Sequence, residues 1–183
     1  MSKADSTEHI VLLRGINVGG VRMKMVDLRK ALEKAGFARV RTVLASGNVV
    51  LESADEDAER VKAQVEATLR EAFGYEAWVV MTSAAELGAV LEGYPFDEEA
   101  EGMQPYVMFA SEAASLEALA ALEPEFDSDV ERIKHARGVL YWEAVRGQST
   151  TSRFAKEAAK RRYASTTTTR NMRTLRKILA LTR

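Results

Sequence analysis

The chain has 183 residues, 46% hydrophobic and 29% charged, which is enough for one good core or two small ones. It contains no cysteine, so disulfides, thiol catalysis and thiolate metal sites are excluded, and a cytoplasmic location is expected. No apolar run approaches the roughly 20 residues that span a membrane, so no membrane partner is expected. The formal net charge of −1 and the pI of about 6.2 argue against a nucleic-acid-binding protein.

The first half of the chain predicts the element order β-α-β-β-α-β. Short apolar runs indicate four strands, at residues 9–14, 39–45, 49–52 and 75–82. Apolar residues at helical spacing indicate two helices, at about residues 25–35 and 55–73. This is the split βαβ, or ferredoxin-like, pattern, and it is complete by about residue 82.

The second half, residues 83–183, predicts a related module. We expect helices at residues 83–91 and 112–122, a strand at 106–110, and a hairpin from 130–135 and 139–145. Ser111 is the expected cap of the second of these helices. Two basic helices are expected to close the chain, at about residues 152–163 and 170–181. The predicted fold class is therefore α+β, with two ferredoxin-like modules (residues 1–82 and 83–183) and C-terminal helices.

The loop from Arg14 to Gly20 is the first candidate anion site. It lies between a strand and a helix, where backbone amides and the helix dipole can hold an anion. Val21 and Arg22 stand where a phosphate-binding loop has Lys and Ser or Thr, so the nucleotide-triphosphate motif is not met. The alternative is that the glycines only allow a tight connection. An anion site here would use Arg14, Gly15, Asn17, Gly19 and Gly20, helped by Arg22.

The segment Ser46–Gly47–Asn48 is the second candidate, with small polar groups at the tip of the predicted hairpin. The alternative is an ordinary turn, since these residues tolerate the positive φ of a tight hairpin. We expect this tip and the loop after the first strand to lie at opposite ends of adjacent strands, so they need not share a site.

The third candidate is the run of threonines at residues 166–169 with Arg170 and Asn171. A threonine before a helix is a good N-cap, which explains Thr168 or Thr169 without a ligand. At a helix start, however, hydroxyls, free amides and a guanidinium together would also suit a phosphate or carboxylate. Both interpretations stay open for Thr168, Thr169, Arg170 and Asn171.

The remaining residues indicate no particular chemistry. His9 and His135 are the only histidines, and their separation gives no metal-ligand spacing, so no metal and no cofactor are expected. No catalytic residues can be assigned, and an enzyme and a binding protein both fit the sequence. Trp78 and Trp142 lie in apolar, strand-like runs, where we expect core packing rather than base stacking.

Three segments together resemble the signature blocks of the bacterial "domain of unknown function 1697" family. They are LRGINVGG at residues 13–20, SGNVV at 46–50 and TTRN at 168–171. The resemblance extends over nearly the whole chain and implies an α+β protein of two ferredoxin-like halves. It implies no reaction, because the activity of the family is not established. Met172 is a departure, since members of the family often have an aromatic residue, usually Trp, at this position.

The preferred hypothesis is a protein that binds a phosphorylated or nucleotide-like anionic small molecule in a cleft between the modules. Arg14 and Arg170 would neutralise the anion, and Asn17, Asn48 and Asn171 would orient it. One alternative is nucleic-acid binding by the basic C-terminal helices, which we consider less well supported. The oligomeric state stays open.

The other alternative is structural, and it rests on the uneven distribution of charge. Residues 146–183 contain eleven Lys or Arg against Glu157 alone, and residues 52–131 contain 21 acidic residues against three basic ones. The basic end of the chain can therefore dock on the acidic middle of the same chain or of a partner chain, without any ligand.

Overall fold

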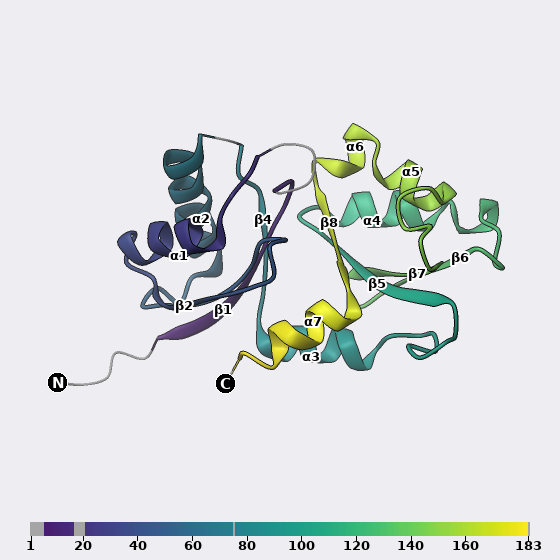
Figure 1. The fold of residues 1–183 in the computed structure, drawn as a ribbon, viewed down its shortest axis with the longest axis horizontal. Coiled ribbons are helices and arrows are strands. Elements are labelled where there is room, and N and C mark those ends of the chain that lie inside the picture. The colour runs from purple at the N-terminus through teal and green to yellow at the C-terminus, as the bar shows by residue number, and fades with distance from the viewer. Residues whose placement is uncertain (1–5, 17–20, 75, 183) are drawn as a thin grey trace. The chain divides into compact units, whose positions relative to one another are not determined.

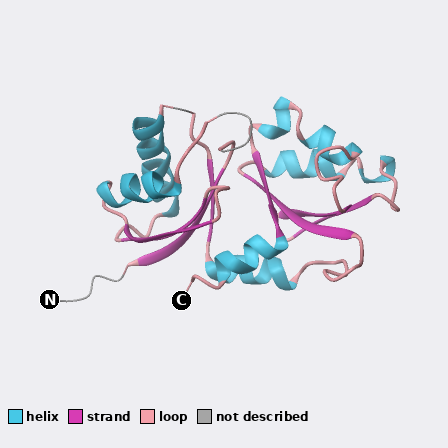
Figure 2. Cartoon of the chain, viewed as in Figure 1, coloured by secondary structure: helices cyan, strands magenta, loops and turns pink. Residues whose placement is uncertain are grey.

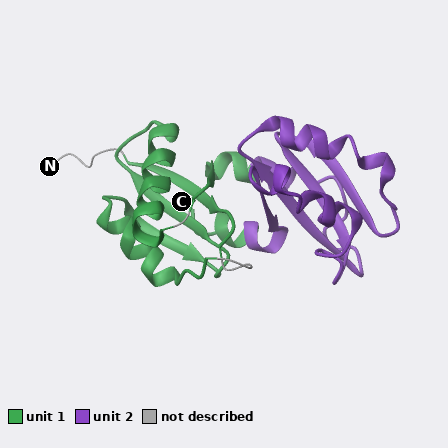
Figure 3. Cartoon of the chain, turned by 90° about the horizontal axis from the view of Figure 1, so that it is seen from above, with its two compact units in different colours: residues 1–88, 176–183 green, residues 89–175 purple. Residues whose placement is uncertain are grey.

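The computed structural model describes residues 6–16, 21–74 and 76–182 (Figure 1). The chain forms two compact units, Met1–Gly88 with Arg176–Arg183 and Ala89–Leu175 (Figure 3). Each unit contains one four-stranded antiparallel sheet together with helices (Figure 2), so the predicted α+β class is confirmed.

The first unit has the predicted β-α-β-β-α-β order. Its elements are β1 (Thr7–Leu13), α1 (Met25–Lys34), β2 (Ala38–Val43), β3 (Asn48–Ser53), α2 (Ala58–Phe73) and β4 (Val79–Thr82). The strands lie in the order β2-β3-β1-β4, all antiparallel, which is the ferredoxin-like arrangement. Helices α1 and α2 cover one face of the sheet (Figure 1), and the core between them includes Val11, Leu28 and Leu69, each 0% exposed.

The second unit repeats this arrangement. Its strands and inner helices are β5 (Met103–Ala110), α4 (Ala113–Ala120), a short 3-10 turn (Glu123–Glu125), β6 (Glu131–Ala136), β7 (Val139–Val145), α5 (Arg153–Ala158), α6 (Arg161–Ala164) and β8 (Thr167–Asn171). The flanking helices α3 (Ala84–Glu92) and α7 (Met172–Leu179) belong to this unit only in residues 89–92 and 172–175. The strand order is β6-β7-β5-β8, which matches the first sheet strand for strand.

Strand β8 corrects the prediction of a helix that begins at residue 170. Thr167 to Asn171 pair with Ala110 to Tyr106 of β5, and α7 starts only at Met172. The β-branched threonines favour a strand, and β5 supplies partners for their backbone groups. Asn171, not a threonine, caps α7, because its Oδ1 accepts a hydrogen bond from the backbone N of Arg173 at 2.9 Å.

Two further predictions about helices are wrong. The helix expected at residues 152–163 is divided into α5 and α6, because Lys160 between them has an extended backbone (φ −61°, ψ 139°). Helix α4 is preceded by Glu112, whose side chain makes no capping hydrogen bond, so Ser111 is not its cap. Ser152 does cap α5, since its Oγ accepts from the backbone N of Ala155 at 3.2 Å.

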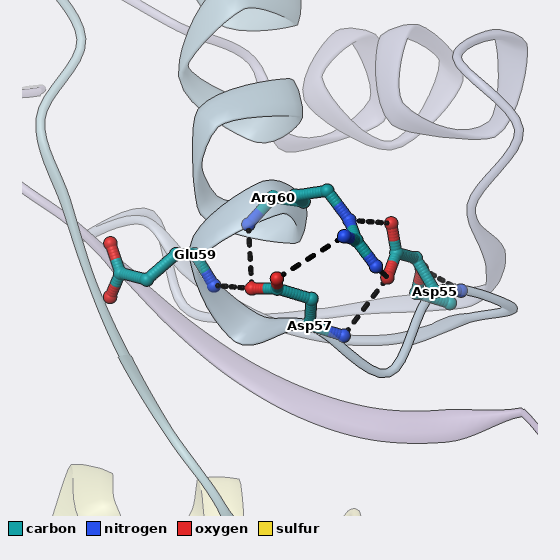
Figure 4. Close-up of polar contacts among 5 residues, drawn as sticks. Asp55, Asp57, Glu59 and Arg60 are labelled. Atoms are coloured by element: carbon teal, nitrogen blue, oxygen red, sulfur yellow. Dashed lines mark hydrogen bonds and ion pairs between the residues drawn. The ribbon is translucent and has the colours of Figure 1, made fainter.

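The start of α2 holds a compact cluster of charges (Figure 4). Asp57 Oδ1 caps the helix by accepting from the backbone N of Glu59 and of Arg60. The Arg60 guanidinium donates to both carboxylate oxygens of Asp55, each at 2.8 Å. These bonds lower the pKa of Asp55 to about 2. The cluster thus lies between the end of β3 and the start of α2, and the carboxylates of Asp55 and Asp57 are engaged in structure.

Acidification is expected to destabilise the first unit through His9 of β1. This side chain is 7% exposed, and burial lowers its pKa from the ordinary 6.5. Between pH 6.5 and the lowered value, the unfolded chain binds more protons than the folded one, so stability falls as the pH falls through this window. Urea unfolding between pH 7.5 and 5.5 should show a slope of up to about 1.4 kcal/mol per pH unit from this group.

The exposed His135 of β6 provides the matched control. His9→Gln should flatten the pH dependence of the unfolding free energy, and His135→Gln should leave it as in the parent. Equal slopes in the parent and in His9→Gln would show that His9 is not responsible.

Candidate functional site

Two of the predicted segments meet at one end of the first sheet. Strand β1 runs antiparallel to β3, with Leu12 opposite Asn48, and the backbone N of Leu13 donates to the carbonyl of Gly47 at 2.8 Å. The expectation that the loop after β1 and the hairpin tip lie at opposite ends is therefore wrong. Because β1 and β3 are antiparallel, the end of β1 adjoins the start of β3.

The contact at Gly47 is tight. Gly47 has φ +74°, and a Cβ atom placed on it would lie 2.6 Å from Cδ1 of Ile16 and 2.7 Å from Cβ of Leu13. Only glycine gives both this backbone conformation and this close approach without strain. Gly47 thus fixes the hairpin directly against the residues that flank Arg14 and Gly15.

Trp78 lies at the same end of the sheet and is exposed. The backbone N of Arg14 donates to the carbonyl of Trp78 at 3.2 Å, and Leu13 pairs with Val79 of β4, beside β1 in Figure 1. The side chain of Trp78 is 45% exposed, so the prediction of core packing is wrong for this residue. It is right for Trp142, which is 4% exposed and stacks on Tyr106 with 4.7 Å between the ring centroids.

A second exposed apolar side chain belongs to the hairpin. Leu44 is 51% exposed and Ser46 beside it is also exposed. Single exposed apolar residues are ordinary, but here two of them come from strand ends that β1 brings together. The sheet-end surface of the first unit is defined as the exposed Gly15, Leu44, Ser46 and Trp78 together with the half-buried Arg14.

Positive charge continues from Arg14 into the start of α1. Ile16 and Val21 form a β-bridge, after which Arg22 and Lys24 are exposed and form no ion pair with any residue that the structure describes. Lys24 occupies the N-cap of α1 and makes no side-chain capping bond. The predicted ligand residues Asn17, Gly19 and Gly20 lie outside the described residues.

Asn48 stabilises the turn. It is 0% exposed, and its Nδ2 donates to the carbonyl of Val43 at 2.8 Å and to Oγ of Ser46 at 2.9 Å. These bonds hold the hairpin closed and orient the hydroxyl of Ser46. The structure therefore places Asn48 beneath the sheet-end surface.

The third predicted segment belongs to β8 of the second unit. Arg170 is 7% exposed, and its Nη1 donates to Oγ1 of Thr168 at 2.7 Å and to the carbonyl of Thr169 at 2.9 Å. Burial lowers the pKa of Arg170 to about 10, so the guanidinium stays charged at neutral pH. That all three segments bind one ligand stays a prediction.

Several cations of the basic C-terminal stretch already have acidic partners within the second unit. Arg153 pairs with Glu125 of the acidic middle, and Lys160 and Arg162 pair with Glu157 at 2.6 and 2.8 Å. The guanidinium of Arg162 also lies over the ring of Tyr163, 4.6 Å from its centroid. A phosphate backbone would have to compete for these groups.

A match to a family model, over residues that include the first two sequence blocks, shows the family of this chain. The chain belongs to the family described as "Protein of unknown function (DUF1697)", whose model matches residues 6–141. No curated protein matches the chain. Among the residues that the structure describes, no helix is long and apolar enough to cross a membrane.

A solved structure shares the fold. The conserved bacterial protein SP0830 from Streptococcus pneumoniae is 23% identical, with a TM-score of 0.79, and the alignment covers 96% of this chain and 98% of that one. An unknown protein from Galdieria sulphuraria is 10% identical with a TM-score of 0.29, over 96% of this chain and 89% of that one. The first likeness supports the two-module fold.

Proposed function

We propose that the first unit binds a phosphorylated, nucleotide-like small molecule at its sheet-end surface. The single observation that carries the proposal is the exposed indole of Trp78 directly beside Arg14, where a buried tryptophan was expected. An aromatic base can stack on an indole, and base–aromatic stacking contributes about 1–3 kcal/mol. The phosphate would lie toward Arg14, Arg22 and Lys24.

Electrostatics favour an anion at this end of the unit. Arg14, Arg22 and Lys24 lie within eleven residues, and the acidic residue that follows them in α1 is Asp27. Arginine binds phosphate bidentately, and the N-terminal amides of α1 are not capped by a side chain. The positive charge thus favours the phosphate of a nucleotide, and the exposed indole favours its base.

A thermal-shift screen tests the proposal on the full chain. Adenosine monophosphate, ribose 5-phosphate, inorganic phosphate and a short oligonucleotide are compared. A ligand at 100 times its Kd should stabilise the protein by about 2.7 kcal/mol, which raises Tm by several degrees for a chain of this length. We expect adenosine monophosphate to raise Tm more than ribose 5-phosphate does, because only the nucleotide carries a base.

Two variants and one control locate the effect. Arg14→Gln and Trp78→Ala should each remove most of the ligand-induced shift in Tm. Arg29→Gln removes an exposed arginine of α1 that forms an ion pair with Glu33 of the same helix, so it should leave the shift unchanged. A shift that survives in Arg14→Gln and Trp78→Ala would place binding elsewhere, and a larger shift with the oligonucleotide would favour nucleic acid.

A further inference from the structure

The second unit contains a cavity outside the sheet-end surface. Its volume is about 310 Å³, and it lies where β5 begins and where β7 and β8 end. Small-molecule pockets in proteins begin at about 300 Å³, so this one suits a ligand of modest size. Its polar lining residues are Glu98, Glu99, Gln104, Arg146, Asn171 and Arg173.

Two arginines from separate elements line this cavity. Arg146 follows β7, Arg173 belongs to α7, both are exposed, and neither forms an ion pair with a residue in the described part of the chain. By contrast, the unit's Arg132, Arg153 and Arg162 each pair with a glutamate. A planar guanidinium binds a carboxylate or phosphate through two parallel hydrogen bonds. Arg146 and Arg173 therefore give the cavity an anion-binding side.

Asn171 adds an oriented donor. Its Oδ1 accepts the hydrogen bond from the backbone N of Arg173, which caps α7. The amide group is planar, so this bond fixes the side chain and leaves Nδ2 as a donor at the cavity. The end of strand β8 thus positions Arg173 and offers a hydrogen-bond donor to a ligand in the cavity.

Two carboxylates line the same cavity. Glu98 and Glu99 lie in a turn that Asp97 fixes, since its Oδ1 accepts from the backbone N of Glu99 at 3.0 Å and its carbonyl accepts from the backbone N of Ala100 at 3.2 Å. No ion pair joins Glu99 to either arginine of the cavity. Such carboxylates attract an ammonium group and repel a highly charged anion.

We propose that this cavity binds a small zwitterion of the amino-acid class. Its carboxylate or phosphate contacts Arg146 and Arg173, and its ammonium group contacts Glu98 and Glu99. This site is separate from the nucleotide site proposed for the first unit and does not depend on it.

Calorimetric titration of the full chain tests this assignment with L-glutamate, O-phospho-L-serine and glycerol 3-phosphate, which lacks the ammonium group. We expect at least one of the two zwitterions to bind, and to bind more tightly than glycerol 3-phosphate. Arg146→Gln and Arg173→Gln should each weaken that binding about tenfold or more, because each removes charged hydrogen bonds. Glu99→Gln should weaken binding of the zwitterion and should not weaken binding of glycerol 3-phosphate, an anion that the Glu99 carboxylate repels.

The matched control is Arg161→Gln, which removes an exposed arginine of the same unit that does not line the cavity. Arg161→Gln should bind the zwitterions with the same affinity as the parent. The proposal is overturned if neither zwitterion binds at about 10 mM, a concentration that would reveal even weak millimolar affinity. It is also overturned if glycerol 3-phosphate binds as tightly as the zwitterions, or if Arg146→Gln and Arg173→Gln behave like Arg161→Gln. If adenosine monophosphate still binds Arg146→Gln and Arg173→Gln, these substitutions do not affect the nucleotide site proposed for the first unit.

Discussion

Replacing Glu131 by alanine is expected to lower the free energy of unfolding by about 3–5 kcal/mol, one of the largest effects of any single change in this chain. Glu131 is 2% exposed and joins three elements of the second unit. Its Oε2 accepts from Nε1 of Trp142 at 3.2 Å, and its Oε1 accepts from the backbone N of Phe154 at 2.8 Å. Alanine would leave an indole N–H and a helix N–H buried without an acceptor.

Urea unfolding followed by circular dichroism measures the loss. Glu131→Gln is the matched control: it keeps the shape and one acceptor oxygen, so it should lose clearly less stability than Glu131→Ala. Exposed Glu117 of α4 offers a second control, since Glu117→Ala should change stability by less than about 0.5 kcal/mol. Equal losses for Ala and Gln at position 131 would mean that its hydrogen bonds do not carry the effect.

Gly47→Ala is expected to cost about 2–4 kcal/mol, because it combines backbone strain with a steric overlap. The residue has φ +74°, and the new Cβ would lie 2.7 Å from Cβ of Leu13, an atom that moves only with its strand. The substitution should also weaken nucleotide binding, since it moves the hairpin away from Arg14. Thermal unfolding should show a fall of about 2–4 °C per kcal/mol for a chain of this length.

Gly74→Ala separates the two causes. Gly74 has φ +65° at the C-terminal end of α2, and a Cβ placed on it would meet nothing within 4 Å. It should therefore show the backbone strain alone, about 1 kcal/mol, with nucleotide binding retained. Equal losses at the two glycines would contradict the close contact between the hairpin and Leu13.

The sequence predicts the elements of the first unit well because local patterns determine them. Alternating and continuous apolar runs indicate its four strands, and the 3.6-residue period of Leu28 and Leu32, with Gly36 after them, indicates α1. Local patterns do not predict strand β8, because its formation depends on a distant partner. Thr167 to Arg170 become a strand through pairing with β5, some sixty residues earlier, and no local signal carries that partner.

The candidate site was only partly predictable. Arg14 and the hairpin residues stand out in the sequence, but their proximity depends on the antiparallel pairing of β1 with β3. Trp78 was misassigned because the strand starts at Val79, which leaves the indole just beyond the end of the sheet. The apolar residues around it, Ala77 and Val79, are buried and made the whole run look like core.

Fluorescence of Trp78 gives the most direct test of the proposed nucleotide site. Trp142 is buried, so among the two tryptophans only Trp78 can stack on a ligand at the surface. Titration with adenosine monophosphate should quench part of the emission of the parent, and Trp78→Phe should show no saturable quenching. Ribose 5-phosphate should quench little, because it has no base. Unquenched emission in the parent at nucleotide concentrations that raise Tm, or equal quenching in Trp78→Phe, would contradict binding at this surface.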